Sequence, residues 1–431
     1  MPDEFMELEP ELAADGKVDT IPVRSNSVRV PKTFKALQHR NFQLYFGGQL
    51  ISVAGTWMQA IAQAWVVYQL THSDFWLGVV AFAAAIPGLI ITPFGGVIVD
   101  RVPKRRLLVI TQSSAMILAF ILAALSFLNV VQVWHLVALA FGLGIVNAFD
   151  GPGRQAFVVE MVGRDDLPNA IAINSMMFNG ARVIGPAIGG VLLASVGASW
   201  CFFINGLSFL AVIVVLLAMK IHTQRVIKSG TTAWHQLKTG VRYVFEHIEM
   251  SALIMLSLIF SVFGISYIAL LPAFVTEVLH VDATGYGALN AALGLGAVVG
   301  AFVVAHQGDR GQRGRWVTWA NIGFPIALLA FANNTNFVLA LGLAFVLGIG
   351  FMLEFTNINT LLQLNVVEGM RGRVMSLYTL TFFGFAPFGN LALGNLAQVW
   401  GLGKAISASA VIALVLAAIV LLLVPKVREM K

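Results

Sequence analysis

The sequence predicts an all-α integral membrane protein in which twelve transmembrane helices form two six-helix halves related by a pseudo-two-fold axis. Three observations lead to this fold class: an apolar composition, twelve apolar runs of membrane-spanning length, and an internal repeat. Hydrophobic residues make up 58% of the 431-residue chain and charged residues only 11%. A soluble protein carries about 25% charged residues, so composition alone favours a membrane protein.

The apolar runs have the length of helices that cross a hydrocarbon core about 30 Å thick. They lack the alternation over about ten residues that is typical of a transmembrane β-strand. Residues 1–40 are polar, so we expect the first run to act as the insertion signal. The expected spans are residues 42–70, 75–99, 106–128, 132–154, 168–196, 199–220, 251–277, 284–306, 316–333, 336–361, 374–399 and 403–425.

The basic residues predict the orientation of these spans. Apart from Arg182 and Lys404, every Lys and Arg falls in a terminal tail or in a loop that follows an even-numbered span. Loops rich in Lys and Arg remain on the cytoplasmic side. We therefore expect a multi-pass protein of the inner or plasma membrane with both termini in the cytoplasm. The net charge of +6 then reflects topology rather than a nucleic-acid partner.

Two motifs occur twice in the same order. DRVPK at 100–104 corresponds to DRGQR at 309–313, and QAFVVE at 155–160 corresponds to QLNVVE at 363–368, with offsets of 209 and 208 residues. Parallel repeats of six helices are typical of transporters that have a central site between their halves. The predicted division is a cytoplasmic, partly disordered tail (1–40), a first half (41–220), a cytoplasmic linker (221–250), a second half (251–425) and a short cytoplasmic tail (426–431).

Within the linker, residues 233–248 predict an amphipathic helix that rests on the membrane surface. Its apolar face consists of Trp234, Leu237, Val241, Val244, Phe245 and Ile248. A simple connecting role is the alternative for this segment.

The sequence offers nothing for cofactor or enzyme chemistry. Cys201 is the only cysteine, and the eight histidines are scattered. There is no His/Cys cluster, phosphate-binding loop or nucleophile motif. We therefore expect no metal, no cofactor and no enzymatic activity.

The charged stretch GVIVDRVPKR after the second span resembles the loop signature of the major facilitator superfamily, in which Pro103 replaces the usual glycine. The resemblance implies that Asp100 locks the two halves together by facing the N-terminus of the eleventh helix, where Arg373 lies and where an anion is favoured. The other implied gating residues are Gly96, Arg101, Lys104 and Arg105, with Asp309 and Arg310 in the second copy.

A second stretch, RVIGPAIGG at 182–190, is similar to the antiporter motif that the superfamily's exporters carry in their fifth helix. Proline bends a helix by removing a backbone hydrogen bond, and glycine permits a close approach of neighbouring helices. Gly185, Pro186, Gly189 and Gly190 therefore predict a kinked, closely packed helix between the halves. Ordinary packing of small residues is the alternative.

Residues 150–175 and 371–389 also resemble the exporter subfamily that includes macrolide efflux proteins and the enterobactin exporter. This resemblance implies efflux of amphipathic small molecules without naming the cargo.

Ionisable residues inside a span are functional candidates because an unpaired charge there costs several kcal/mol. Arg182 and Glu354 both fall near the middle of their predicted spans. The hypothesis is that Glu354 carries the coupling proton and that Arg182 pairs with it in one conformation only. A structural pair, or a carboxyl in a wet cavity, is the alternative. Asp150 is a further proton-coupling candidate, although we expect it mainly to organise the following loop with Arg154.

By the same resemblance, helices 1, 4, 7 and 10 line the substrate cavity. Aromatic rings with a few amides suit a large amphipathic ligand. The candidates are Trp57, Gln59, Gln63, Trp65, Asn147, Tyr267 and Asn357.

The sequence thus predicts a monomeric secondary transporter in the lipid bilayer that exports drugs or secreted metabolites such as siderophores, with protons as the coupling ion. An importer or facilitator on the same fold, or a membrane receptor or scaffold that transports nothing, remains as the alternative.

Overall fold

A computed structural model describes residues 32–163, 166–219, 233–307 and 313–430, and throughout these ranges the regular structure is helical. The first half contains α1 (Arg40–Thr71), α2 (Asp74–Arg101), α3 (Lys104–Phe127), α4 (Val133–Val162), α5 (Leu167–Ser195) and α6 (Ala198–Ala218). The linker contributes α7 (Ala233–Glu246). The second half contains α8 (Ile248–Ile259), α9 (Leu271–Glu277), α10 (Ala283–Gln307), α11 (Arg313–Ala332), α12 (Phe337–Asn365), α13 (Glu368–Trp400) and α14 (Leu402–Leu423).

Ten of the described helical segments are long and apolar enough to cross a membrane, and one of them runs from α8 through α9. The helices α11 and α13, with 20 and 33 residues, also have spanning length but carry more polar side chains. Together these segments correspond to the twelve predicted spans. Several helices extend past the apolar runs, as α13 does by beginning at Glu368 rather than at 374. The apolar run marks only the part of a helix suited to hydrocarbon.

The seventh span is not a regular helix. A π-helical turn, η2 (Phe260–Gly264), and a 3-10 turn, η3 (Ser266–Leu270), lie between α8 and α9. Pro272 stands in the first turn of α9, where its missing N–H costs no hydrogen bond. Irregular turns of this kind frequently mark functional positions, and here they carry Tyr267.

The linker helix α7 ends at Glu246, and α8 begins at Ile248 after the single residue His247. Gly240 packs against the backbone of Arg373, so α7 lies along the start of α13. Val244 is buried in this contact, whereas Phe245 and Ile248 are exposed. The exposed apolar side chains fit a helix that contacts the membrane surface.

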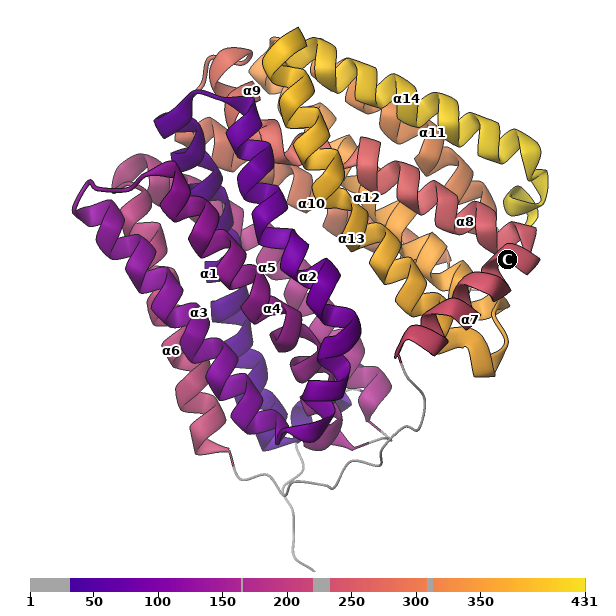
Figure 1. The fold of residues 1–431 in the computed structure, drawn as a ribbon, viewed down its shortest axis with the longest axis horizontal. Coiled ribbons are helices and arrows are strands. Elements are labelled where there is room, and N and C mark those ends of the chain that lie inside the picture. Colours follow the sequence, from indigo (N-terminus) through magenta and orange to yellow (C-terminus); the bar gives the residue numbers. More distant parts are fainter. Residues whose placement is uncertain (1–31, 164–165, 220–232, 308–312, 431) are drawn as a thin grey trace, which may run out of the picture.

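The two groups of helices meet along two pairs, α2 with α13 and α5 with α10. We call the end of the bundle that carries α7 and the C-terminus the linker end, and the opposite end, which carries α9 and the turn between α1 and α2, the short-turn end. In Figure 1 the indigo-to-magenta helices and the orange-to-yellow helices lie closest near the short-turn end and spread apart toward the linker end.

The buried apolar side chains follow the same division. The largest buried cluster crosses between the halves and includes Met58 and Tyr68 of the first half and Tyr267 and Phe331 of the second. Two clusters near the linker end each belong to one half only. Apolar packing therefore joins the halves around the middle and the short-turn end.

Candidate functional site: a central cavity lined by an arginine

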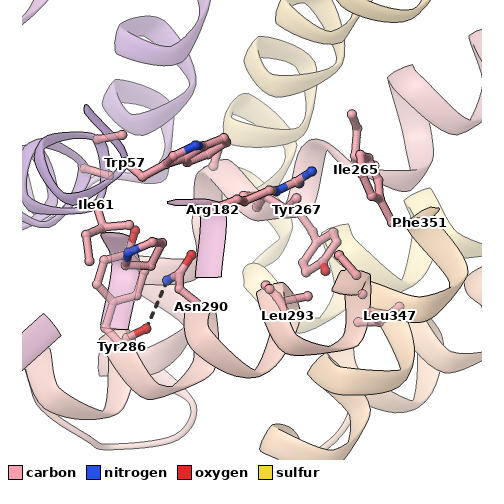
Figure 2. A pocket seen from close by; sticks show the side chains of 18 of the residues that line it. Trp57, Ile61, Arg182, Ile265, Tyr267, Tyr286, Asn290, Leu293, Leu347 and Phe351 are labelled. Carbon is pink, nitrogen blue, oxygen red and sulfur yellow. Dashed lines mark hydrogen bonds between the residues drawn. The ribbon is translucent and has the colours of Figure 1, made fainter. Parts of the chain in front are cut away.

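A cavity of about 210 Å³ lies where the two halves meet. Helices α1 and α5 contribute one wall, and η3, α10, α11 and α12 contribute the other. Its surface is mostly apolar and aromatic, as is typical of sites for small organic molecules. Figure 2 shows the side chains that converge on it, among them Trp57, Ile61, Arg182, Ile265, Tyr267, Tyr286, Asn290, Leu293, Leu347 and Phe351.

Arg182 extends from the middle of α5 into this cavity. The carbon atom of its guanidinium lies 5.4 Å from the ring centre of Trp57 and 4.4 Å from that of Phe351. These are distances at which an aromatic face attracts a cation. Among the described residues, no carboxylate forms an ion pair with Arg182 and no acceptor hydrogen-bonds to it.

Glu354 lies on α12, three residues after Phe351, and its side chain is completely buried. Both of its carboxyl oxygens lack a hydrogen-bond partner, and it forms no ion pair with Arg182 in this structure. Tyr378 of α13 lies within electrostatic range and donates its hydroxyl to the carbonyl of Phe355. No other carboxyl group in the described chain has both oxygens buried and without a partner, although Asp74 has one.

Asp150 of α4 is also buried, but it is fully surrounded by donors. Its Oδ1 accepts hydrogen bonds of 2.7 Å from Thr111 and from Gln112 of α3. Its Oδ2 forms an ion pair with Arg154, whose guanidinium in turn donates to Gln49 of α1. The predicted contact with Arg154 is therefore present, and the group ties α1, α3 and α4 together.

The glycines of the α5 motif lie at two different helix contacts. A methyl group on Gly185 or Gly189 would collide with α1 at Ala54 or Met58. On Gly190 it would come within 2.3 Å of the Cα of Gly287, across the junction between α5 and α10. Pro186 faces the cavity.

The basic loop after α2 is described in part. Lys104 is buried, and Arg105 donates hydrogen bonds of 2.6 Å to the carbonyls of Leu216 and Leu217, which end α6. A cation at a helix C-terminus stabilises the exposed carbonyls. Arg373 lies at the start of α13 beside α7. Outside the described part of the chain lie the surroundings of Gly96, the side chains of Asp100 and Arg101, and the residues Asp309 and Arg310.

Of the seven predicted cavity residues, Trp57 and Tyr267 line the cavity, and Trp65 stacks on the lining residue Tyr286 with 5.7 Å between ring centres. The other four lie elsewhere. Gln59 accepts a hydrogen bond from Asn205 of α6, and Gln63 donates to the carbonyl of Leu136 of α4. Asn147 is exposed, and Asn357 donates to its own helix at Leu353.

Sequence reasoning missed the contribution of α10. Tyr286 and Asn290, one helical turn apart, line the cavity, and the amide of Asn290 donates to the carbonyl of Tyr286. A tyrosine and an asparagine four residues apart in an apolar span share a helix face, and this spacing was the available signal. Phe351 and Leu347, at the same spacing on α12, face the cavity as well.

The halves also contact each other through polar groups at the short-turn end. The Tyr68 hydroxyl of α1 donates to Glu277 of α9 over 2.6 Å, and Ser73 donates to Gln398 of α13 over 2.7 Å. No group of three His, Cys, Asp or Glu residues in the described ranges has the geometry of a metal site.

Comparison with known proteins agrees with this architecture. Residues 32–431 match the profile of the transmembrane secretion effectors of the major facilitator superfamily. The chain belongs to this family. It is 27% identical to the staphyloferrin A transporter of Staphylococcus aureus over 84% of this chain and 91% of that one. The solved nucleoside transporter NupG superposes with a TM-score of 0.72 at 11% identity, over 89% of this chain and 98% of that one.

Two further relatives have names that state a direction of transport. The enterobactin exporter EntS of Shigella flexneri is 23% identical and covers 91% of this chain and 94% of its own. The multidrug efflux pump Tap of Mycolicibacterium fortuitum is 23% identical and covers 88% and 95%. The family resemblance drawn from the sequence motifs is thus confirmed, and the chain is a multi-pass membrane transporter by family and fold.

Proposed function

We propose that this protein exports amphipathic small molecules across the cell membrane in exchange for protons. The observation that carries the proposal is the mainly apolar and aromatic cavity at the junction of the two halves. A site between two six-helix units can be exposed to either side by rocking one unit against the other. The relatives named as an enterobactin exporter and a multidrug efflux pump support the outward direction and the amphipathic cargo.

We infer that the linker end faces the cytoplasm and that this structure is the inward-facing state. The positive-inside rule supports the orientation, because the basic loops belong to the linker end. The hydrogen bonds of Tyr68 with Glu277 and of Ser73 with Gln398, together with the shared apolar cluster, hold the opposite end closed. In the outward-facing state, Asp100 would approach the N-terminus of α13 near Arg373 and close the cytoplasmic end.

Glu354 is the proton carrier in this proposal. An ionised carboxylate in the middle of a membrane protein requires a partner or water, and Glu354 has neither a donor nor a cation beside it. Protonation removes the charge and so removes this cost. Asp150, by contrast, contacts three donor groups and belongs to a network that joins helices of the first half. The predicted pair between Arg182 and Glu354 would then belong to a different conformation of the cycle.

Growth inhibition in a bacterial host without its own efflux pumps tests this function. The host expresses wild-type protein, Glu354→Gln, or the control Glu429→Gln, an exposed carboxyl near the C-terminus, at matched membrane levels. The panel contains amphipathic antibiotics, dyes and siderophores. We expect resistance with wild type and with Glu429→Gln, and sensitivity with Glu354→Gln because glutamine cannot bind and release a proton.

Proteoliposomes then separate export from coupling. Cargo movement by the wild type should drive a proton flux that a pH-sensitive dye reports, and Glu354→Gln should show none. Resistance that persists in Glu354→Gln would remove this residue from the cycle. Sensitivity of the wild type across the whole panel would contradict export of amphipathic molecules.

A further inference from the structure

The cation in the cavity, Arg182, has no anionic partner among the residues that the structure describes. Arg182 stands near the middle of α5 and lines the space between the halves, and none of the cavity-lining residues carries a carboxyl group. Glu354, the closest acid along α12, lies outside the lining and does not pair with Arg182. An arginine at this depth is costly unless something balances its charge.

The aromatic faces beside Arg182 balance that charge in part and fix its position. Trp57 comes from α1 and Phe351 from α12, so the guanidinium lies between the two halves of the protein. Contact with an aromatic face uses the flat side of the guanidinium. The N–H groups point outward in the guanidinium plane, and in this structure they meet no acceptor from the described residues. The arginine is therefore held in place while its donors remain free.

The rest of the cavity wall indicates what the missing partner looks like. It presents apolar side chains such as Ile61, Ile265, Leu293 and Leu347, together with the rings of Tyr267 and Tyr286. An organic cation in this cavity would be repelled by the positive charge of Arg182, and the lining contains no acidic group to offset that repulsion. An oxygen anion would fit the free guanidinium edge in a bidentate contact, and an apolar or aromatic body would fill the remaining volume of about 210 Å³.

We propose that the central cavity recognises amphipathic organic anions, with Arg182 binding a carboxylate or a similar acidic oxygen group and the rings of Trp57 and Phe351 holding that arginine in position. This proposal specifies the substrate class of the proposed exporter. It rests on the proposed function in one respect, which is that the bound anion is the exported cargo. The cavity accommodates a ring-sized, acid-bearing part of a ligand, so a larger cargo would enter it with that part first.

Binding to the purified full-length protein in lipid nanodiscs tests this assignment. The probes are 1-naphthoate and 1-naphthylmethylammonium, which share a ring system and carry opposite charges, and equilibrium dialysis against empty nanodiscs corrects for uptake by lipid. We expect wild type to bind naphthoate about tenfold or more tightly than the ammonium compound, the size of one charge-assisted contact. The preference should vanish in Arg182→Gln.

Two further variants make the result specific. Lys404→Gln removes one exposed positive charge far along the chain from the cavity and should leave the preference unchanged. Arg182→Lys keeps the charge but loses the planar donors, so it should retain a reduced preference. It also serves as the informative variant if Arg182→Gln does not yield a monodisperse protein.

Equal affinity of the wild type for the two probes, failure to bind either, or a preference that survives undiminished in Arg182→Gln or Arg182→Lys would overturn the assignment. The measurement needs neither a proton gradient nor net transport. Failure of the export proposal in cells would therefore leave the binding preference intact, and the two proposals can fail separately.

Discussion

Two carboxyl groups are buried on corresponding helices of the two halves, and the protein surrounds them in opposite ways. Asp150 of α4 is 4% exposed and receives two hydrogen bonds and an ion pair. Glu354 of α12 is 0% exposed and receives none. The two are not copies of one residue. Under the repeat offset of 208, Asp150 corresponds to Ile358, and Glu354 corresponds to Val146.

This difference shows which of the two carboxyl groups is held in place by the surrounding side chains. The partners of Asp150 come from α3 and from its own helix, and Arg154 extends the group to α1. These contacts link three helices, so Asp150 serves as a structural joint of the first half. Glu354 has no such partner, so no hydrogen bond in this structure fixes its carboxyl group. The second half thus holds the unpartnered carboxyl on which the proposed proton coupling rests, and the first half holds the bonded network.

The largest expected effect is a contrast in stability between two matched amide substitutions. Asp150→Asn should lower the free energy of unfolding by about 3 kcal/mol or more, because it leaves Arg154 buried without its counter-charge. Glu354→Gln should leave stability unchanged or raise it, because no ion pair is lost. Thermal unfolding of both variants in the same detergent, followed by far-ultraviolet circular dichroism, measures the contrast.

The double variant Asp150→Asn with Arg154→Met is the control, since removing both partners of a buried pair restores much of the lost stability. A Glu354→Gln protein as unstable as Asp150→Asn would mean that Glu354 has a partner in the native protein. The contrast between the halves would then be lost.

The sequence pointed to the charged residues that lie deep within the predicted spans, but it could not predict which side chains surround them. The apolar runs located the spans, and an ionisable residue inside a run drew attention to Arg182 and Glu354. Among other outcomes, a polar residue inside a span can bond to a neighbouring helix or face the cavity. Gln59 and Gln63 have partners on α6 and α4, whereas Tyr286 and Asn290 face the cavity. The rotation of each helix decides between the two outcomes.

The sequence gives little information about how each helix is rotated about its axis, because most of the spans are apolar on every face. A helix that is apolar all round gives little indication of which face meets its neighbours, so the wall formed by α10 was missed. The glycines of α5 were easier to interpret, because a missing side chain is informative wherever backbones approach closely. The interruption between α8 and α9 was not foreseen, since Gly264 and Pro272 are also compatible with an ordinary membrane helix.

A third carboxyl, Glu277, lies between the two extremes, with a single donor from the other half. Tyr68→Phe removes that donor and should weaken the closure of the short-turn end by about tenfold, which is the lower end of the range for one hydrogen bond to a charged group. Spin labels at Val130→Cys and Thr335→Cys, both exposed near this end, would report a longer distance in a larger share of molecules. The buried Cys201 is replaced by serine for this measurement.

Gln69→Ala, which truncates the neighbouring exposed residue on α1, is the control and should leave the distance distribution as in wild type. If Tyr68→Phe also left the distances unchanged, the hydrogen bond would contribute nothing to closure, and the apolar cluster alone would hold this end together.

The smallest effect concerns Asp166, a carboxyl outside the membrane spans with two cationic partners. Hydrogen bonds from His39 and then from Lys35, each 2.8 Å long, lower its pKa below the ordinary value of 3.8. A lowered pKa stabilises the contact at all pH values above the ordinary one, and the contribution is lost as the pH falls through the lowered value. Acid should therefore release residues 32–39 from the start of α5.

Hydrogen exchange at the amide of Ala36, which donates to Asn169 over 2.8 Å, reports this release. After correction for the intrinsic pH dependence of exchange, wild-type protection should fall by a few-fold between pH 6 and about pH 3, near the ordinary range of aspartate. In Asp166→Asn the protection should already be low at pH 6 and change little. The surface position keeps the effect small, because exposed pairs contribute little in water. A wild-type protection that is constant over this range would show that Asn169 and the apolar contacts of Ala36 hold the segment without Asp166.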